Sequence, residues 1–438
     1  MMKKQIVKPS LLPGFMELLP ADQIVFNGMM DKIRNVYENY GFIPMDTPVI
    51  EKSEVLLAKG GGETEKQVYR FNKGDSDLAL RFDLTVPLAR YVAQHMSELT
   101  FPFRRYQIGK VYRGEKSQKG RYREFYQCDI DIIGNEKLSV INDAQLPSII
   151  FSIFKELGLN EFKIHINNRK VISGFFEALG IENKTEVLRI IDKVDKIGVD
   201  KVKAELKDNA ISDENIEKIA EFISFDESNE EALAFLKELN IKDESFLEGV
   251  DELSKVVHYM KAFGVSLENF IIDLKIARGL DYYTGTVFET TLDKYPEVGS
   301  ICSGGRYDNL AENYTNKNLP GVGISIGLTR LFSQLKELGL LKGNSPSTLT
   351  EVLVVPVDDT MDYCINIANK LRENNIVTEV YLEEGNMNKK LKYANKLGIA
   401  NVILVGEEEV NSGLLTFKKF DTGEQFKLSI EEIIKGFK

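Results

Sequence analysis

Two stretches far apart in the chain are rich in side chains that could do chemistry. Residues 104–131 are predicted to form a strand, a short charged loop and a second strand, and the other stretch covers residues 275–289. Side chains alternate faces along a strand. One face of the second predicted strand therefore combines cations, an aromatic ring, an amide and carboxylates, namely Arg121, Arg123, Phe125, Gln127, Asp129 and Asp131. This face is improbable in a core and is suited to a nucleotide and a zwitterion.

The arginines of this hairpin indicate phosphate binding. The loop GEKSQKG separates Arg113, at the end of the first strand, from Arg121. A triphosphate needs several converging cations, and arginine offers a fork of donors. Phe125 could stack on an adenine, while Gln127 and Asp131 could bind an amino acid. A solvated hairpin with cross-strand ion pairs is the structural alternative. It does not explain the apolar and aromatic residues of the opposite face, Tyr122, Tyr126, Ile130 and Ile132.

Residues 321–326 are predicted to form a strand, and Gly327 is predicted to open a helix. Arg330 then falls in the first turn, where backbone N–H groups and a guanidinium together favour a phosphate. The alternative is close packing of small residues against a helix. Small side chains on one face of the strand would leave room for a flat ligand, namely Gly321, Gly323 and Ser325.

The second stretch contains Arg278 beside a glycine in an otherwise apolar region. A buried arginine needs an anionic partner. That partner is a substrate in the functional interpretation and Asp281 in the structural one. SGGRYDN, at 303–309, could close a pocket through its glycines with Tyr307 as a wall, but the pattern alone favours a simple turn.

A further pair, Asp83 and Thr85, lies at a predicted strand-to-helix junction in LRFDLTVPLARY. The two side chains could accept hydrogen bonds from a substrate ammonium. Either of them could instead cap the helix that begins there.

The elements around these patterns are predicted to fall into several domains. Residues 182–262 are Lys/Glu-rich and amphipathic, which predicts a helical insertion, and alternating strands and helices after 350 predict an α/β domain with a largely parallel sheet. The predicted bounds are 1–181 and 263–340 for the two parts of a catalytic domain, 182–262 for the insertion, 341–350 for a linker and 351–438 for the last domain.

Composition excludes several classes of protein. The 438 residues are 43% hydrophobic and carry a net charge of −11, with three cysteines and three histidines. No apolar run approaches the roughly 20 residues of a membrane helix. Few, scattered cysteines and histidines argue against a disulfide framework or a protein-bound metal. We therefore expect a cytoplasmic protein without a signal peptide, membrane segment, metal centre or prosthetic group.

Together these residues resemble the class II aminoacyl-tRNA synthetases, and most closely the histidyl-tRNA synthetase family, from about residue 10 to the C-terminus. YENYGFIPMDTPVIE, Arg113-Gly-Glu115 with Gly120–Gln127, and GVGISIGLTRL are similar to the three class motifs, and Pro48 matches the proline of the dimer interface. ARGLDYYTGTVFE and SGGRYDNL are similar to the two histidine-specific signatures. The resemblance implies an α+β catalytic domain built on an antiparallel sheet and a C-terminal α/β domain that binds the anticodon.

The resemblance also implies residue roles. Arg113 would contact the α-phosphate, Arg121 and Arg330 the outer phosphates, Phe125 the adenine ring and Glu115 its amino group. Asp83, Thr85 and Gln127 would bind the histidine ammonium. Asp131 and Tyr283 would read the imidazole, Tyr282 and Tyr307 would be further histidine-binding residues, and Arg278 would bridge the histidine carboxylate and the α-phosphate. Asp83 and Asp131 stand where the family pattern has glutamates.

The implied partners are L-histidine, ATP with Mg²⁺ that travels on it, the tRNA for histidine and a second copy of the chain in a homodimer. Loop residues Lys116, Gln118 and Lys119 are expected to touch the acceptor end of the tRNA. The anticodon is expected to meet a basic helix that carries Lys389, Lys390, Lys392 and Lys396. Two alternatives stay open: a non-catalytic regulatory relative of the synthetase, and an ATP-dependent ligase for another amino acid.

Overall fold

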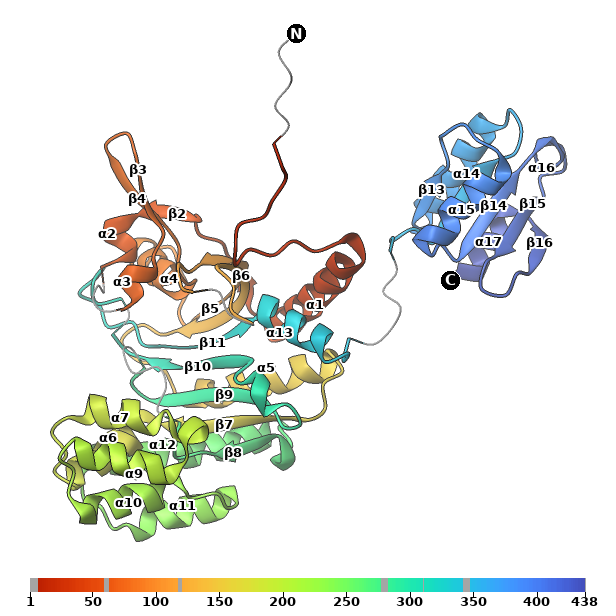
Figure 1. The fold of residues 1–438 in the computed structure, drawn as a ribbon. Helices are drawn as coiled ribbons and strands as arrows, with labels where there is room; N and C mark the ends of the chain where they lie inside the picture. The colour runs from red at the N-terminus through yellow and green to blue at the C-terminus, as the bar shows by residue number, and fades with distance from the viewer. Residues whose placement is uncertain are drawn as a thin grey trace. The chain divides into compact units, whose positions relative to one another are not determined.

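A computed structural model describes residues 7–58, 63–116, 120–276, 283–309, 311–341 and 347–437. The chain divides into two compact units, formed mainly by Met29–Leu341 and by Lys342–Lys438. Figure 1 labels the helices and strands of both.

The larger unit is built on an eight-stranded sheet with the order β1-β5-β6-β11-β10-β9-β7-β8. Its inner pairs are antiparallel, whereas the outermost pairs, β1–β5 and β7–β8, are parallel. The strands are β1 (Ile43–Pro44), β5 (Phe103–Tyr112), β6 (Glu124–Ile133), β7 (Phe162–Asn168), β8 (Phe270–Ile272), β9 (Thr286–Leu292), β10 (Cys302–Tyr307) and β11 (Gly321–Gly327). The antiparallel sheet expected from the resemblance is confirmed.

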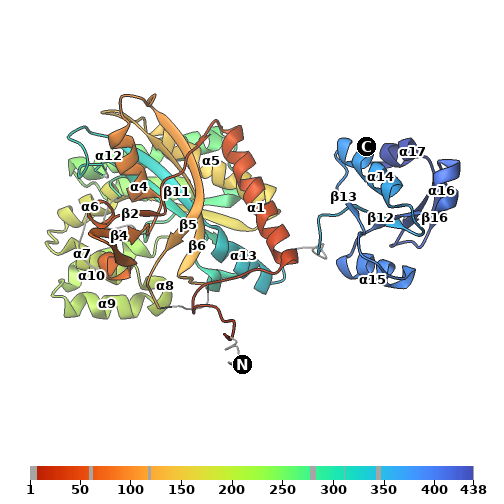
Figure 2. The ribbon, with the colours of Figure 1, turned by 90° about the horizontal axis from the view of Figure 1, so that it is seen from above.

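Helices alone cover one side of this sheet, and helices together with a small second sheet cover the other (Figure 2). The first side carries α1 (Pro20–Asn39), α5 (Ile141–Glu156) and α13 (Leu328–Glu337). The other side carries α2 (Ser53–Leu56), α3 (Glu63–Gln67), α4 (Thr85–Gln94) and a three-stranded sheet of β2 (Ile50–Lys52), β3 (Arg70–Lys73) and β4 (Ser76–Leu80). The apolar face predicted for β6 is confirmed, because Ile130 and Ile132 are fully buried.

The apolar face of α1 packs against its own sheet. Ile33 and Tyr37 are fully buried, and the Tyr37 hydroxyl donates to the carbonyl of Cys128 over 2.9 Å. The apolar face of this helix is thus covered within its own domain and offers little surface to a partner. Ile43 and Ile50, which follow it, remain 53% and 47% exposed.

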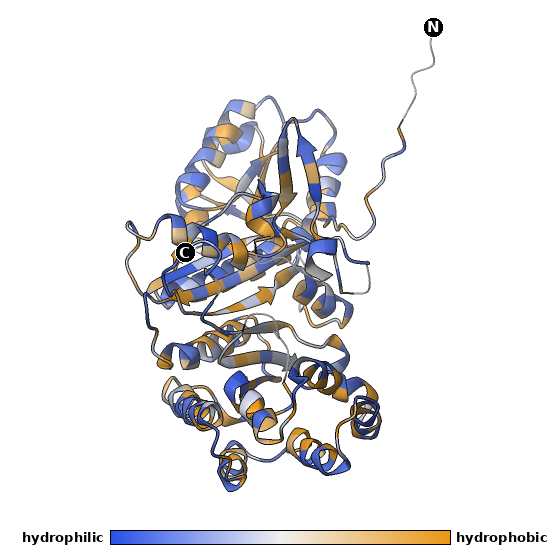
Figure 3. Ribbon diagram, turned by 90° about the vertical axis from the view of Figure 1, so that its left-hand side faces the viewer, coloured by the Kyte–Doolittle hydropathy of each residue, from blue (hydrophilic) through white to orange (hydrophobic). Residues whose placement is uncertain are grey.

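Between residues 184 and 262 the chain forms helices, as the Lys/Glu-rich texture predicts. They are α7 (Lys184–Ile191), α8 (Val194–Ile197), α9 (Val199–Asp208), α10 (Asp213–Ile223), α11 (Asn229–Glu238) and α12 (Glu244–Ala262), and α6 (Arg169–Ala178) precedes them. Figure 1 shows this group beside the β7–β8 end of the sheet. In Figure 3 hydrophobic and hydrophilic positions alternate around these helices, which is the pattern of helices that bury one face. The exact bounds of the insertion stay a prediction.

The smaller unit holds a five-stranded sheet with the order β13-β12-β14-β15-β16. Its elements are β12 (Val352–Pro356), α14 (Met361–Glu373), β13 (Thr378–Val380), α15 (Met387–Leu397), β14 (Asn401–Val405), α16 (Glu407–Ser412), β15 (Leu415–Lys419), β16 (Gln425–Leu428) and α17 (Ile430–Phe437). The first three strands in chain order are parallel, but β15 and β16 join as an antiparallel hairpin. The sheet is therefore mixed, and the strand–helix alternation continues as far as β15, where the β15–β16 hairpin ends it.

One member of the predicted basic helix is not on the surface. Lys390 of α15 is only 8% exposed, and its Nζ donates to the carbonyl of Pro356 over 2.7 Å. The four-lysine surface predicted for this helix is therefore wrong at Lys390. Lys389, Lys392 and Lys396 are exposed.

Candidate active site

The register of the large sheet gathers polar residues from distant parts of the chain. One row across β5, β6, β11 and β10 consists of Arg105, Asp131, Gly323 and Gly305. The next row consists of Gln107, Asp129, Ser325 and Ser303. Residues paired across neighbouring strands point to the same face. The two rows therefore form a polar floor inside an otherwise apolar sheet.

A cleft of about 550 Å³ opens above this floor. The sequence-predicted residues that line it are Asp83, Thr85, Arg113, Glu115, Arg121, Phe125, Gln127, Asp131, Tyr283, Tyr307 and Arg330. Lys116 is described and exposed but does not line the cleft. Arg278, Tyr282, Gln118 and Lys119 lie outside the described residues. Eleven residues predicted from five separate stretches thus meet in one cleft.

Two predictions about neighbouring residues need correction. β6 begins at Glu124, so Arg121 and Arg123 precede the strand and do not share its alternation. Arg121 still faces the cleft, whereas Arg123 turns away and donates from Nε to the carbonyl of Glu115 over 3.0 Å. The second correction concerns SGGRYDN, whose residues 303–307 belong to strand β10 instead of a turn and place Tyr307 at the cleft wall.

Arg113 is held between aromatic rings. Its guanidinium carbon lies 4.4 Å from the ring centroid of Phe82 and 5.1 Å from that of Phe125, and its Nε donates to the carbonyl of Phe82 over 3.2 Å. Cation–π contacts of this kind favour a fixed side chain. Arg121 is more exposed and lies 3.4 Å from Glu115 Oε2. This end of the cleft therefore contains two different arginines. Arg113 is fixed by its neighbours, whereas Arg121 forms an ion pair that solvent can reach.

Arg330 lies where the helix prediction places it. Gly327 is the N-cap of α13, and Arg330 follows in its first turn. Its Nη2 donates to the carbonyl of Val298 over 2.7 Å. That contact ties the guanidinium to the segment between β9 and β10 at the rim of the cleft.

The other end of the cleft is acidic. Asp131 Oδ2 lies 2.5 Å from Nη2 of the fully buried Arg105, and Asp131 Oδ1 accepts a hydrogen bond from the Tyr307 hydroxyl over 2.7 Å. Burial nevertheless raises the pKa of the Asp131 carboxyl, against the opposing effect of Arg105. Asp131 is thus fixed by the protein before a ligand arrives.

The glycines of β10 and β11 make room for protein side chains. A Cβ at Gly323 would lie within 2.0 Å of Asp131 Oδ1, one at Gly321 within 2.3 Å of the Tyr307 ring, and one at Gly305 within 2.9 Å of the Tyr283 ring. The prediction that this strand leaves space for a flat ligand is therefore wrong at Gly321 and Gly323. The Asp131 carboxylate fills the space at Gly323, and the Tyr307 ring fills the space at Gly321.

At the Asp83–Thr85 junction the capping interpretation is correct, and both residues also line the cleft. Asp83 Oδ1 accepts from the backbone N–H groups of Thr85 and Val86 over 3.2 and 2.9 Å, at the start of α4. Burial raises the pKa of Asp83. Capping holds the carboxylate at the cleft wall.

Asp129 belongs to the site and carried no predicted role. It is 2% exposed and lines the cleft between Gln127 and Asp131. Burial raises its pKa to about 7, although the charge of Arg105 and the hydroxyl of Ser325 act in the opposite direction. The alternation along β6 places Asp129 on this face. The sheet order, which the sequence pattern does not give, decides what surrounds it.

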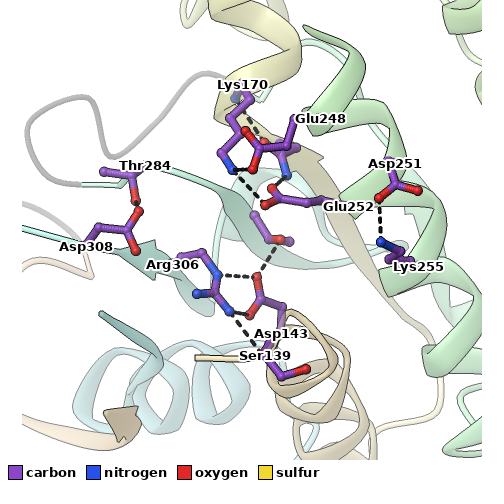
Figure 4. Close-up of polar contacts among 12 residues, drawn as sticks. Ser139, Asp143, Lys170, Glu248, Asp251, Glu252, Lys255, Thr284, Arg306 and Asp308 are labelled. Atoms are coloured by element: carbon purple, nitrogen blue, oxygen red, sulfur yellow. Dashed lines mark hydrogen bonds and ion pairs between the residues drawn. The ribbon is translucent and has the colours of Figure 1, made fainter. Parts of the chain in front are cut away.

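A buried ion pair supports the cleft wall from below (Figure 4). Asp143 of α5 is fully buried and accepts from Arg306 Nε over 3.0 Å and Nη2 over 2.6 Å, and from Thr286 Oγ1 over 2.7 Å. Arg306 directly precedes Tyr307, and Thr286 begins β9. The Asp143–Arg306 ion pair therefore fixes β9 and β10, the two strands that form this wall of the cleft.

Comparison with known proteins agrees with this geometry. The family model described as histidyl-tRNA synthetase matches residues 14–331, and the model described as an anticodon binding domain matches residues 351–438. A histidine–tRNA ligase of Clostridium tetani is 63% identical over 437 residues, with 100% of each chain covered. One from Clostridium acetobutylicum is 54% identical and covers 98% of this chain and 99% of its own.

Solved structures show the same relationship. The crystal structure of histidyl-tRNA synthetase from Nostoc sp. PCC 7120 has a TM-score of 0.92 and 41% identity, and the match covers 99% of this chain and 100% of that one. The matched models and relatives extend over both units. This chain belongs to the histidyl-tRNA synthetase family.

Proposed function

We propose that this protein is a histidine–tRNA ligase, which activates L-histidine with ATP and transfers it to its tRNA. The observation that carries the proposal is the single cleft with arginines and an aromatic ring at one end and fixed carboxylates at the other. An aminoacyl-adenylate has the complementary distribution of charge, with an anionic phosphate at one end and an ammonium group at the other. Full-length relatives that are named histidine–tRNA ligase support the choice of amino acid.

In the proposed first step, a carboxylate oxygen of histidine attacks the α-phosphorus of ATP. The bond to the bridging oxygen breaks, and pyrophosphate leaves. In the second step, a hydroxyl at the 3′ end of the tRNA attacks the acyl carbon, and AMP leaves. Negative charge crowds together in the first step, so positioned cations lower its barrier most. No side chain needs to become covalently attached.

The residue roles follow the two ends of the cleft. We assign the α-phosphate to Arg113, the outer phosphates to Arg121 and Arg330, and the adenine to Phe125 and Glu115. The ammonium is assigned to Asp83, Thr85 and Gln127, and the imidazole to Asp131, Tyr283 and Tyr307. Arg121 and Glu115 contact each other without a ligand, so both must exchange that contact for ATP. Arg278 and Tyr282 keep the roles implied by the resemblance, as proposals.

The decisive experiment is ATP–pyrophosphate exchange with a panel of the twenty amino acids. We expect exchange with L-histidine and background rates with the others. The same preparation should then charge a tRNA for histidine. Exchange that depends on another amino acid would favour the general ligase alternative. A protein that binds histidine but exchanges no pyrophosphate would favour the regulatory one.

Mg²⁺ is proposed to enter the cleft on the phosphates of ATP. In the described part of the chain no group of three His, Cys, Asp or Glu side chains is placed to hold a metal ion. None of the described helices has the length and apolar character needed to cross a membrane. The three cysteines are buried as free thiols. That state suits the reducing cytoplasm in which we propose the protein works.

The smaller unit is proposed to bind the anticodon of the tRNA, through a surface that includes Lys389, Lys392 and Lys396. A match to an anticodon-binding family model over residues 351–438 supports this proposal. Lys116, Gln118 and Lys119 are proposed to meet the acceptor end of the same tRNA.

A homodimer is proposed from the exposed apolar residues after α1. Ile43 and Ile50 lie in the stretch that the resemblance assigns to the interface. Half-exposed apolar side chains on short strands are typical of a surface that a partner subunit covers. We expect the protein to sediment as a dimer at micromolar concentration and Ile50→Glu to shift it toward the monomer. Leu247→Glu, at a 52% exposed position of α12, is the control and should remain dimeric. A wild-type protein that is an active monomer would contradict the proposal.

A further inference from the structure

Helix α13 carries one of the two arginines proposed for the outer phosphates, and it also contacts the segment that carries the other. Arg330 lies in the first turn of α13, and Ser333 follows it by three positions, so the two side chains are neighbours on the helix surface. Ser333 Oγ shares a hydrogen bond of 2.7 Å with the hydroxyl of Tyr122, the residue directly after Arg121. This hydrogen bond joins the two arginine-bearing segments across 211 positions of sequence.

Further contacts hold the residues around the start of β6 against the same helix. Gly120 has a φ of +72°, and a Cβ at this position would lie 3.1 Å from Gln334 Nε2. The backbone N–H of Tyr126 donates to Thr329 Oγ1 over 2.9 Å. The helix therefore meets this segment on both sides of the Tyr122 hydroxyl, and the Tyr122–Ser333 bond is the side-chain link between them.

The side chain of Arg121 is held only loosely at its far end. It is 55% exposed, and its Nη1 lies 3.4 Å from Glu115 Oε2. An exposed ion pair of that length contributes little and restrains a long side chain weakly. The backbone of Arg121 lies before β6, which begins at Glu124. The place from which this guanidinium reaches into the cleft is therefore set by its anchored neighbour, Tyr122.

We infer that Tyr122 and Ser333 are positioning residues, which hold Arg121 at a fixed separation from Arg330 so that both guanidiniums can meet the outer phosphates of one ATP molecule. This inference rests on the proposed function and adds to it the contact that aligns the two arginines. Pyrophosphate carries away the charge released in the first step, and cations that are placed in advance need little reorganisation to stabilise it. AMP lacks the outer phosphates, so its binding should not depend on this contact.

The test removes each hydroxyl in turn, with Tyr122→Phe and Ser333→Ala. In pyrophosphate exchange we expect the KM values for ATP and for pyrophosphate to rise about 3–10-fold, which corresponds to the loss of one net hydrogen bond. The KM for histidine and the inhibition constant of AMP should equal those of the wild type. The double variant should lose no more than either single variant, because both remove the same contact. Ser333→Thr keeps a hydroxyl and should recover most of the affinity.

A background of Arg121→Ala separates positioning from a purely structural role. If Tyr122 acts through Arg121, Tyr122→Phe should raise the KM for pyrophosphate in the wild-type background and cause no further rise once Arg121 is alanine. A structural role would instead impair both backgrounds by the same factor and lower both melting temperatures. That outcome, or an unchanged KM for pyrophosphate in both single-hydroxyl variants, would overturn the inference.

Ser152→Ala is the matched control. Ser152 Oγ shares a hydrogen bond of 2.9 Å with the Tyr40 hydroxyl, and neither residue lines the cleft. We expect wild-type kinetics from this variant. If Tyr122→Phe and Ser333→Ala both fail to fold, the contact is structural and the inference is wrong. Absence of histidine-dependent exchange in the wild type would instead remove the proposed function itself, and the rise in melting temperature caused by ATP compared with AMP would still test the contact.

Discussion

Replacing Arg113 with alanine is expected to slow histidyl-adenylate formation about 10²–10³-fold, the loss seen when one preorganised charged donor is removed. The guanidinium is already fixed between the rings of Phe82 and Phe125 and bonded to a backbone carbonyl, so it reorganises little during the reaction. Arg113→Lys should recover only part of the rate, because an ammonium lacks the two-pronged geometry and the ring stacking. Single-turnover formation of the adenylate measures the effect directly.

The control for this experiment is Arg189→Ala. Arg189 is an exposed arginine on α7 that lies 3.4 Å from Glu186 and does not line the cleft. We expect its adenylation rate to equal that of the wild type. If Arg113→Ala keeps its rate and only the melting temperature falls, the residue is a structural clamp for the two rings and has no part in the chemistry.

Replacing Asp143 with alanine is expected to lower the free energy of unfolding by about 3–5 kcal/mol, because it leaves Arg306 buried without its counter-ion. The side chain of Arg306 is 8% exposed, and that of Asp143 is fully buried. The double variant Asp143→Leu with Arg306→Met should be more stable than Asp143→Ala alone, since it removes both charges. Urea unfolding followed by circular dichroism provides the measurement.

Asp251→Ala is the control for the buried pair. Asp251 and Lys255 also form an ion pair, 2.5 Å long and visible in Figure 4, but their side chains are 61% and 53% exposed. An exposed pair one helical turn apart contributes about 0.5 kcal/mol or less. Equal loss of unfolding free energy in Asp143→Ala and Asp251→Ala would show that burial does not determine how much the Asp143–Arg306 pair contributes to stability.

Much of the phosphate end of the cleft could be predicted from local sequence. Arg113, Phe125 and Arg330 are placed by a hairpin and by a strand followed by a helix, and both patterns are visible in short stretches of residues. Period-two alternation also predicts the buried face of β6 correctly. These elements can be predicted because they depend only on residues that are close together in the sequence.

The acidic end could not be predicted in the same way. It depends on β6 lying between β5 and β11, which are far apart in the sequence. Arg105 and Asp131 pair across the local β5–β6 hairpin, but only the place of β11 shows that Gly323 makes room for the Asp131 carboxylate and that Ser325 lies beside Asp129. The same limit explains Lys390, which helical periodicity cannot distinguish from an exposed lysine. Its partner is a carbonyl on β12, across the core.

The sheet order also has a consequence for the way the chain is made. Strand β6 is synthesised early and β11 late, with the whole helical group between them. Until β11 emerges from the ribosome, β6 offers an unpaired edge whose alternate side chains, such as Ile130 and Ile132, are destined for the core. Pairings between distant segments form slowly, whereas local helices form fast. We therefore expect the helices of residues 184–262 to fold first, and the nascent chain to need protection of β6 until the last third of the catalytic unit is complete.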